Sequence, residues 1–149
     1  MARWHAAQRG LDWEIDIDQC NYHSSLGPEW DVKRGEKPQH LEAFDTIELT
    51  GKIVSSADAP SNHAEILIFA EEIDLKKVWS QPPTIGHMQD RNDRMHFAVW
   101  VHDRMFLALT SYGSAGRLVR ARLRTDLIEK NFAKVRSISV STSRPEVEN

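Results

Sequence analysis

The stretch MHFAVWVHDRMFLALTS, residues 95–111, carries the clearest sign of how this chain folds. Two apolar runs, 95–101 and 104–110, flank the polar pair His102-Asp103. Apolar runs joined by two polar residues are typical of a tight β-hairpin. Because both faces of each run are apolar, we expect this hairpin at the centre of a sheet rather than at its edge.

Alternation of apolar and polar residues extends the β pattern to much of the chain. In residues 13–18 every odd position is apolar and every even position is acidic, which gives a strand one dry face and one charged face. Gly51 interrupts a similar pattern and predicts a bulge or a bend there. Further strands are predicted, by alternation or by a short apolar run, at 44–54, 64–70, 117–124 and 135–143.

Helix signals are few. Short helices are predicted at 3–9, at 71–79 and at 126–134, where Asp126 and Glu129 have the spacing of a helix start. The polar segments 21–43 and 80–94 are predicted as long loops, which are uncommon in small domains and often carry function. Six or seven strands with one or two short helices predict an all-β fold, either an antiparallel β-sandwich or a partly open β-barrel, with α+β as the alternative.

Length and composition fit one small domain spanning 1–149. No segment approaches the ~20 apolar residues of a membrane helix, so we expect no membrane association. Cys20 is the single cysteine, and the first residues lack the apolar centre of a secretory signal, which favours a cytoplasmic location. The formal net charge is −3, yet residues 95–149 carry nine bases and five acids.

Two charged ladders of opposite sign account for much of this asymmetry. Arg120, Arg122 and Arg124 share one face of a predicted strand, and the three acids of the other ladder are Glu14, Asp16 and Asp18. One interpretation is that each ladder faces water or that the two pair across neighbouring strands. The other makes the arginine ladder a binding site for an anionic ligand or single-stranded nucleic acid, because guanidinium groups match phosphate geometry. The acidic net charge argues against nucleic acid.

Metal and cofactor sites are not predicted. Cys20 and His23 have the spacing of half a zinc site, but the chain offers no second close pair. His96 and His102 share a strand face at a separation of about 20 Å, too far for one metal ion. D-x-D spacing in the acidic ladder is common on solvated strand faces, and no phosphate-binding or dinucleotide-binding loop is present.

A catalytic centre is not predicted either. The segment around Ser114 has neither the spacing nor the strand-to-helix context of a nucleophile elbow. A small hydrolytic enzyme remains an alternative, with His23, His87 and Asp90 as its candidate groups because they lie in the predicted loops.

The aromatic content favours association. Five tryptophans are many for this length. Trp13 is predicted in the core and Trp100 in a strand, while the others could pack over the sheet or face a partner. The preferred hypothesis is therefore a non-catalytic module that associates with itself or with another protein. Anion binding through the arginine ladder and hydrolysis are the alternatives.

Overall fold

The computed structural model describes residues 10–28, 41–54, 62–71 and 84–143, with the isolated positions 35 and 37; for residues 28 and 41–44 it describes the backbone alone. The predicted helix at 3–9, nearly all of the one at 71–79, and Trp4, Trp30 and Trp79 lie outside these residues.

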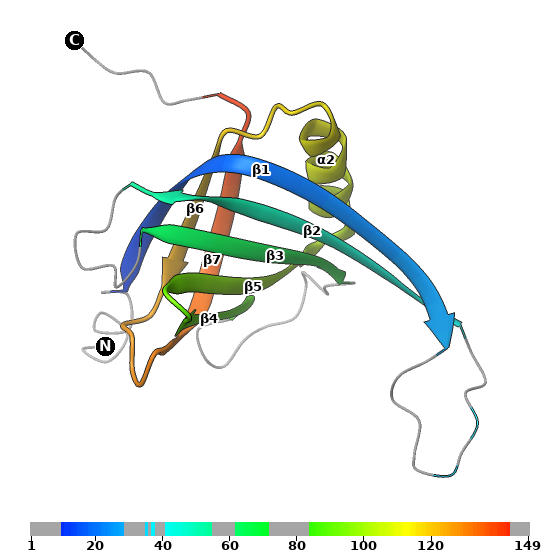
Figure 1. The fold of residues 1–149 in the computed structure, drawn as a ribbon, viewed down its shortest axis with the longest axis horizontal. Helices are drawn as coiled ribbons and strands as arrows, with labels where there is room; N and C mark the ends of the chain where they lie inside the picture. The colour runs from blue at the N-terminus through cyan, green and yellow to red at the C-terminus, as the bar shows by residue number, and fades with distance from the viewer. Residues whose placement is uncertain are drawn as a thin grey trace, which may run out of the picture.

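The described residues form seven strands and one helix. The strands close into a barrel in the order β1-β2-β3-β5-β4-β7-β6, in which β6 returns to pair with β1 (Figure 1). Neighbouring strands are antiparallel except β3 and β5, which run parallel. In chain order, the elements are β1 (Leu11–Pro28), β2 (Leu41–Ile53), β3 (His63–Glu71), β4 (Gly86–Arg91), β5 (Arg94–His102), α2 (Asp103–Ser114), β6 (Arg120–Thr125) and β7 (Phe132–Ser141).

This architecture confirms the predicted all-β class with a short helix. The sheet is one closed barrel, so all seven strands have a neighbour on each side for at least part of their length. The parallel β3–β5 pair comes from a crossover, since β4 follows β3 in sequence but pairs on the far side of β5.

The barrel interior follows directly from the alternation in the sequence. On β1, Trp13 and Ile15 point inward and are buried, while the acids between them face outward. Trp13 packs edge-on against Phe97 of β5, with ring centroids 5.8 Å apart. Its indole Nε1 donates to the buried Oγ1 of Thr125 at 2.9 Å, so the polar atom of this core side chain is satisfied.

The hairpin prediction is wrong in its second half. Residues 95–101 lie in β5, but 103–114 form helix α2 instead of a returning strand. His102 caps the helix, because its Nδ1 accepts from the backbone N–H of Arg104 at 3.1 Å. Phe106, Leu109 and Gly113 are the buried positions of α2, and the spacing from 106 to 109 to 113 is helical.

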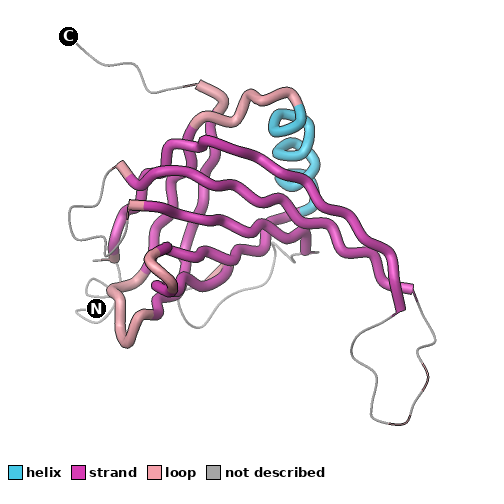
Figure 2. The backbone as a smooth tube through the Cα atoms, in the orientation of Figure 1, coloured by secondary structure: helices cyan, strands magenta, loops and turns pink. Residues whose placement is uncertain are grey.

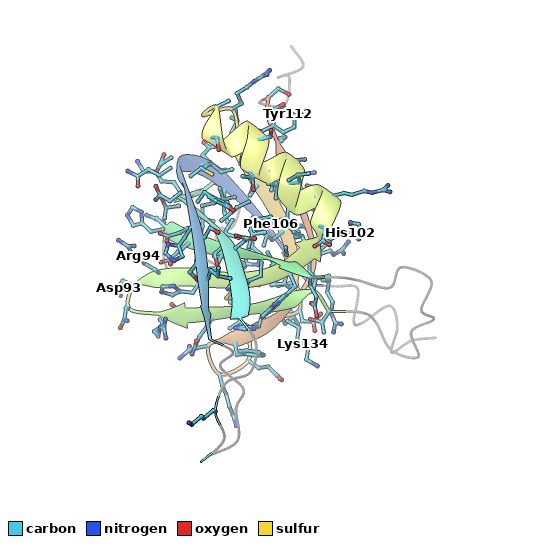
Figure 3. All side chains as sticks on the ribbon, turned by 90° about the vertical axis from the view of Figure 1, so that its right-hand side faces the viewer. Asp93, Arg94, His102, Phe106, Tyr112 and Lys134 are labelled. Carbon is cyan, nitrogen blue, oxygen red and sulfur yellow. The ribbon has the colours of Figure 1, made fainter. Side chains whose placement is uncertain are left out.

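Helix α2 lies across one end of the barrel, against β1, β3 and β5. Among the described residues α2 is the only helix, and it is the cyan segment beside the strands in Figure 2. Figure 3 shows it from the side, with His102 at its start, Phe106 on the side of the strands and Tyr112 near its end.

Two other predicted segments also differ. The helix predicted at 126–134 is a tight turn, with Lys130 and Asn131 at φ of 51° and 65° and a bridge between Glu129 and Phe132. The loop predicted at 80–94 contains β4, which turns into β5 through Asn92 and Asp93 at φ of 55° and 59°. Positive φ at both central residues matches the twist of the flanking strands, so both turns favour hairpins.

The loop predicted at 21–43 is mostly strand where it is described. β1 continues to Pro28 and β2 begins at Leu41. A bulge or bend was predicted at Gly51, and the bulge lies in the partner strand instead: the β1–β2 register shifts between Ile17 and Gln19 of β1, opposite Gly51. A Cβ at Gly51 would come within 1.9 Å of the Asp16 carbonyl oxygen, so only glycine fits this close approach.

Candidate functional site

The structure brings the two charged ladders together on the outer face of the barrel. In the β1–β6 register, Glu14 lies opposite Arg122 and Asp16 opposite Arg120. Arg120 donates from Nε and Nη2 to Oδ1 of Asp16, at 3.0 and 2.8 Å, and from Nη1 to Oε2 of Glu14 at 3.4 Å. Arg122 donates from Nη2 to Oε1 of Glu14. Of the two interpretations of the ladders, the geometry matches cross-strand pairing.

The membership of the acidic ladder differs from the prediction. Asp12, opposite Arg124, is its third acid, whereas Asp18 lies in the bulge between Ile17 and Gln19, beyond Asp16, the last residue of β1 that pairs with β6. The hydrogen bond and the charge of Glu14 raise the pKa of Arg122, so this guanidinium stays charged at any ordinary pH.

The arginine ladder is thus neutralised by its neighbours. Arg122 still exposes 61% of its side chain, but an anionic ligand would compete with carboxylates already within contact distance. Anion binding through Arg120, Arg122 and Arg124 stays a prediction.

The three groups considered for hydrolysis do not converge. His23 is an exposed residue of β1, whereas His87 and Asp90 belong to β4, and in the barrel β1 and β4 have other strands between them on both sides. Along β4, positions 87 and 90 point to opposite faces because side chains alternate. His87 packs instead between two rings, Trp100 at 6.1 Å and Phe132 at 5.8 Å between centroids.

His96, His102 and Cys20 have structural contacts. His96 approaches the Arg91 carbonyl oxygen at 3.2 Å and Glu65 at 3.6 Å, and His102 caps α2. Cys20 packs against Gly113 of α2, and partial burial raises the pKa of its thiol. Within the described part of the chain, no three His, Cys, Asp or Glu side chains group as metal ligands would.

The surface that α2 forms at the end of the barrel differs from the charged ladders because it exposes large apolar side chains. The outward face of α2 exposes Leu107 at 73% and Tyr112 at 44% of their surface. They line a shallow depression of about 580 Å³. We call this the α2 surface, and its residues are Arg104, Leu107, Ala108, Ser111, Tyr112, Ala115 and Arg117.

The α2 surface is apolar at its centre and basic at its sides. Arg117 lies 5.9 Å from the centre of the Tyr112 ring, a cation–π contact that orders both side chains. A second depression, of about 380 Å³, shares Ala108 and Tyr112 and extends toward the end of β7. No acidic side chain is among the described residues that line either depression.

Sequence reasoning missed the α2 surface because it read residues 104–110 as a strand. The sequence did hold a signal for the helix: residues 103–109 contain no β-branched side chain and are rich in Leu, Met and Ala. In a helix, positions 104, 107, 108, 111 and 115 fall on one face.

Comparison with known proteins found no match: no protein-family model, no curated protein and no solved structure is significantly similar to this chain. Across the described ranges, the protein has no helix with the length and apolar composition needed to traverse a lipid bilayer.

Proposed function

We propose that this protein is a non-catalytic association module that docks a protein partner on the α2 surface. The observation that carries the proposal is an apolar strip exposed to solvent on the only helix of the described chain, with an arginine on each side. Exposed large apolar groups clustered on one face are costly in water and often mark interfaces. Tyrosine and arginine, both present here, are enriched among residues that dominate binding energy.

The chemistry of the α2 surface suggests what its partner presents. Arg104 and Arg117 are exposed, and acidic residues are absent from the described lining. A partner segment with an apolar side chain flanked by carboxylates would complement this surface. The depressions are shallow and open, which suits a protein surface better than a small molecule that needs enclosure.

The same proposal places the protein in the cytoplasm. Cys20 is the single cysteine, and the raised pKa of its thiol keeps it protonated and slow to oxidise. This pattern is in keeping with a reducing compartment.

A charge placed at the centre of the α2 surface tests the proposal. Leu107→Glu should weaken association at least ~10-fold, because it sets a carboxylate where an apolar contact is needed. Leu127→Glu is the matched control, since Leu127 is 60% exposed but lies outside the α2 surface, between β6 and β7. Circular dichroism should show both variants folded.

The readout has two parts. Wild type and both variants are immobilised at equal density, and the proteins they retain from a cell extract are compared; light scattering reports self-association. The proposal requires that Leu107→Glu alone loses a retained protein or an oligomer. Identical behaviour of all three proteins would contradict it.

A further inference from the structure

One part of the barrel wall continues far beyond the barrel. β6 pairs with β1 only over Leu11–Asp16, and β3 pairs with β2 only over Thr46–Lys52. Past these limits β1 and β2 run on together as a two-stranded ribbon, which projects from the barrel in Figure 1. We call residues 24–28 of β1 and 41–45 of β2 the ribbon; their pairing runs from Ser24 opposite Asp45 to Pro28 opposite Leu41.

The contacts described for the ribbon are at its base. Asp45 accepts from the hydroxyl of Ser24 at 2.6 Å and from that of Tyr22 at 3.1 Å. The Tyr22 ring in turn packs against Phe106 of α2, with centroids 6.4 Å apart. Farther out, no described strand pairs with either edge of the ribbon. An isolated two-stranded ribbon is marginally stable in water and gains stability from a third strand.

The two edges of the ribbon differ in charge. From Cys20 to Pro28, β1 has no Asp, Glu, Lys or Arg, and Leu26 is 69% exposed. β2 carries Glu42, Asp45 and Glu48 over the same length. Natural edge strands are usually protected from pairing by charges, especially lysine, or by bulges. The β1 edge of the ribbon lacks charges over this length and has only Pro28 at its tip.

Backbone hydrogen bonds of β2 determine which amides face the open β1 edge. Val54 donates across to Glu14 of β1, whereas Ile53 donates to Asn62 on the β3 side, so even-numbered residues of β2 face β1. The β1–β2 register has no shift after Gln19. His23 and Ser25 lie opposite even-numbered residues of β2, so their backbone N–H and C=O groups point toward β2. The backbone N–H and C=O groups of Ser24 and Leu26 therefore point to the open edge.

We infer that the β1 edge of the ribbon pairs, antiparallel, with the same edge of a second copy of this chain. Two identical edges related by a two-fold axis run antiparallel, and each then satisfies the outward amides of the other. No like charges meet, since this edge has none. The pairing builds a four-stranded ribbon from two marginal ones. The inference rests on the proposed association function and names one partner and one strand for it.

Proline substitutions at two residues that lie opposite each other in the ribbon test the inference. Leu26 lies opposite Ala43, and their amides point to opposite edges of the ribbon. Leu26→Pro removes an N–H from the β1 edge, and Ala43→Pro removes one from the β2 edge; neither removes a β1–β2 hydrogen bond. The pair thus separates loss of the pairing edge from general damage to the ribbon.

Sedimentation velocity over a range of concentrations gives the main readout. Wild type and Ala43→Pro should dimerise with the same dissociation constant, and Leu26→Pro should weaken the dimer at least ~10-fold. Hydrogen exchange supplies a second readout: the Ser24 and Leu26 amides of wild type should exchange more slowly as concentration rises, while the Ala43 amide should not change.

Three outcomes would overturn the inference. These are a wild-type protein that stays monomeric at ~1 mM, a Leu26→Pro variant that dimerises as wild type does, and an equal loss in both proline variants. Capture of an extended peptide from another protein by a monomeric wild type, lost in Leu26→Pro, would assign the edge to a different partner. Leu107→Glu should leave the ribbon dimer intact. Failure of the proposal for the α2 surface can therefore be distinguished from failure of the ribbon inference.

Discussion

The two halves of β1 are one continuous strand in two environments. Its first half, over Leu11–Asp16, pairs with β6 along its whole length and with β2 from Ile15 onward, and it alternates apolar residues that point inward with acids that face outward. Its last residues, 24–28, have β2 alone and no charged side chain. Strand formation is the same in both halves, but only the first half is part of a closed structure. The difference shows that neighbours, rather than strand propensity, decide which half is closed into the barrel and which half keeps an open edge.

The largest effect is expected in the barrel half, at Trp13. Trp13→Ala removes a fully buried ring that packs on Phe97 and hydrogen-bonds Thr125. The loss of the buried side chain and the cavity that it leaves should cost about 3–5 kcal/mol of unfolding free energy. That is a large part of the ~5–15 kcal/mol typical of small domains. Urea unfolding measures it, and a loss below ~1 kcal/mol would mean that the barrel half is not the stable part.

The junction between the halves gives the next effect, where Cys20 meets Gly113. A Cβ added at Gly113 would lie 2.5 Å from Sγ of Cys20 but 3.8 Å from its Cβ. Gly113→Ala should therefore destabilise the fold by about 1–3 kcal/mol through overpacking.

Cys20→Ala should relieve the overpacking. In a double-mutant cycle, Cys20→Ala and Gly113→Ala should show a favourable coupling of about 1–2 kcal/mol. Additive effects of the two substitutions would mean that α2 and β1 do not meet at this point.

A smaller effect is expected at the outer face of the barrel half. Arg120→Ala leaves Asp16 without its two hydrogen bonds and Glu14 without one of its partners. The expected loss is about 0.5–1 kcal/mol, and it should shrink in high salt because the pair is only partly buried. Urea unfolding at low and high salt provides the measurement.

The same face decides the anionic-ligand alternative. If the arginine ladder is structural, replacing Arg120, Arg122 and Arg124 with alanine lowers stability and changes no affinity for inorganic phosphate or single-stranded DNA. Binding by wild type that weakens with salt and disappears in a folded triple variant would support a ligand site instead.

The smallest effect is expected in the ribbon half. Leu26→Ser replaces a side chain that is 69% exposed and packs on little, so stability should change by less than ~0.5 kcal/mol. Thermal unfolding of monomer at low concentration is the measurement. A loss comparable to that of Trp13→Ala would place the ribbon in the cooperative core and remove the contrast between the two halves.

Much of the barrel could be predicted from the sequence because period-2 alternation is a local property. The inward positions of β1 and β6 follow from it. The prediction of a strand at residues 104–110 was wrong because an apolar run of that length fits a strand or a buried helix equally well. His102 caps this helix, but a capping residue can be identified in a sequence only once a helix is expected after it.

The candidate surfaces could be predicted less well, because they depend on which strands lie side by side in the sheet and in which register. That the two ladders meet was one of two interpretations, yet the exchange of Asp18 for Asp12 depends on the β1–β6 register, which places Asp12 opposite Arg124. Where Asp126 and Glu129 predicted a helix start, the chain forms a hairpin turn through Lys130 and Asn131 that joins β6 to β7. The ribbon is visible only once the ends of β3 and β6 are known.

Closure of the barrel also has a consequence in time. Trp13 and Thr125, which bond across the β1–β6 seam, are 112 residues apart in the chain. During synthesis, β1 leaves the ribosome before the other strands, and it cannot complete its pairing with β6 until residue 125 has also emerged. Until then the nascent chain holds an incomplete sheet, whose apolar face is open along β1. Seam closure is a high-contact-order step, so we expect it to limit the folding rate and to be the stage at which a chaperone is most useful.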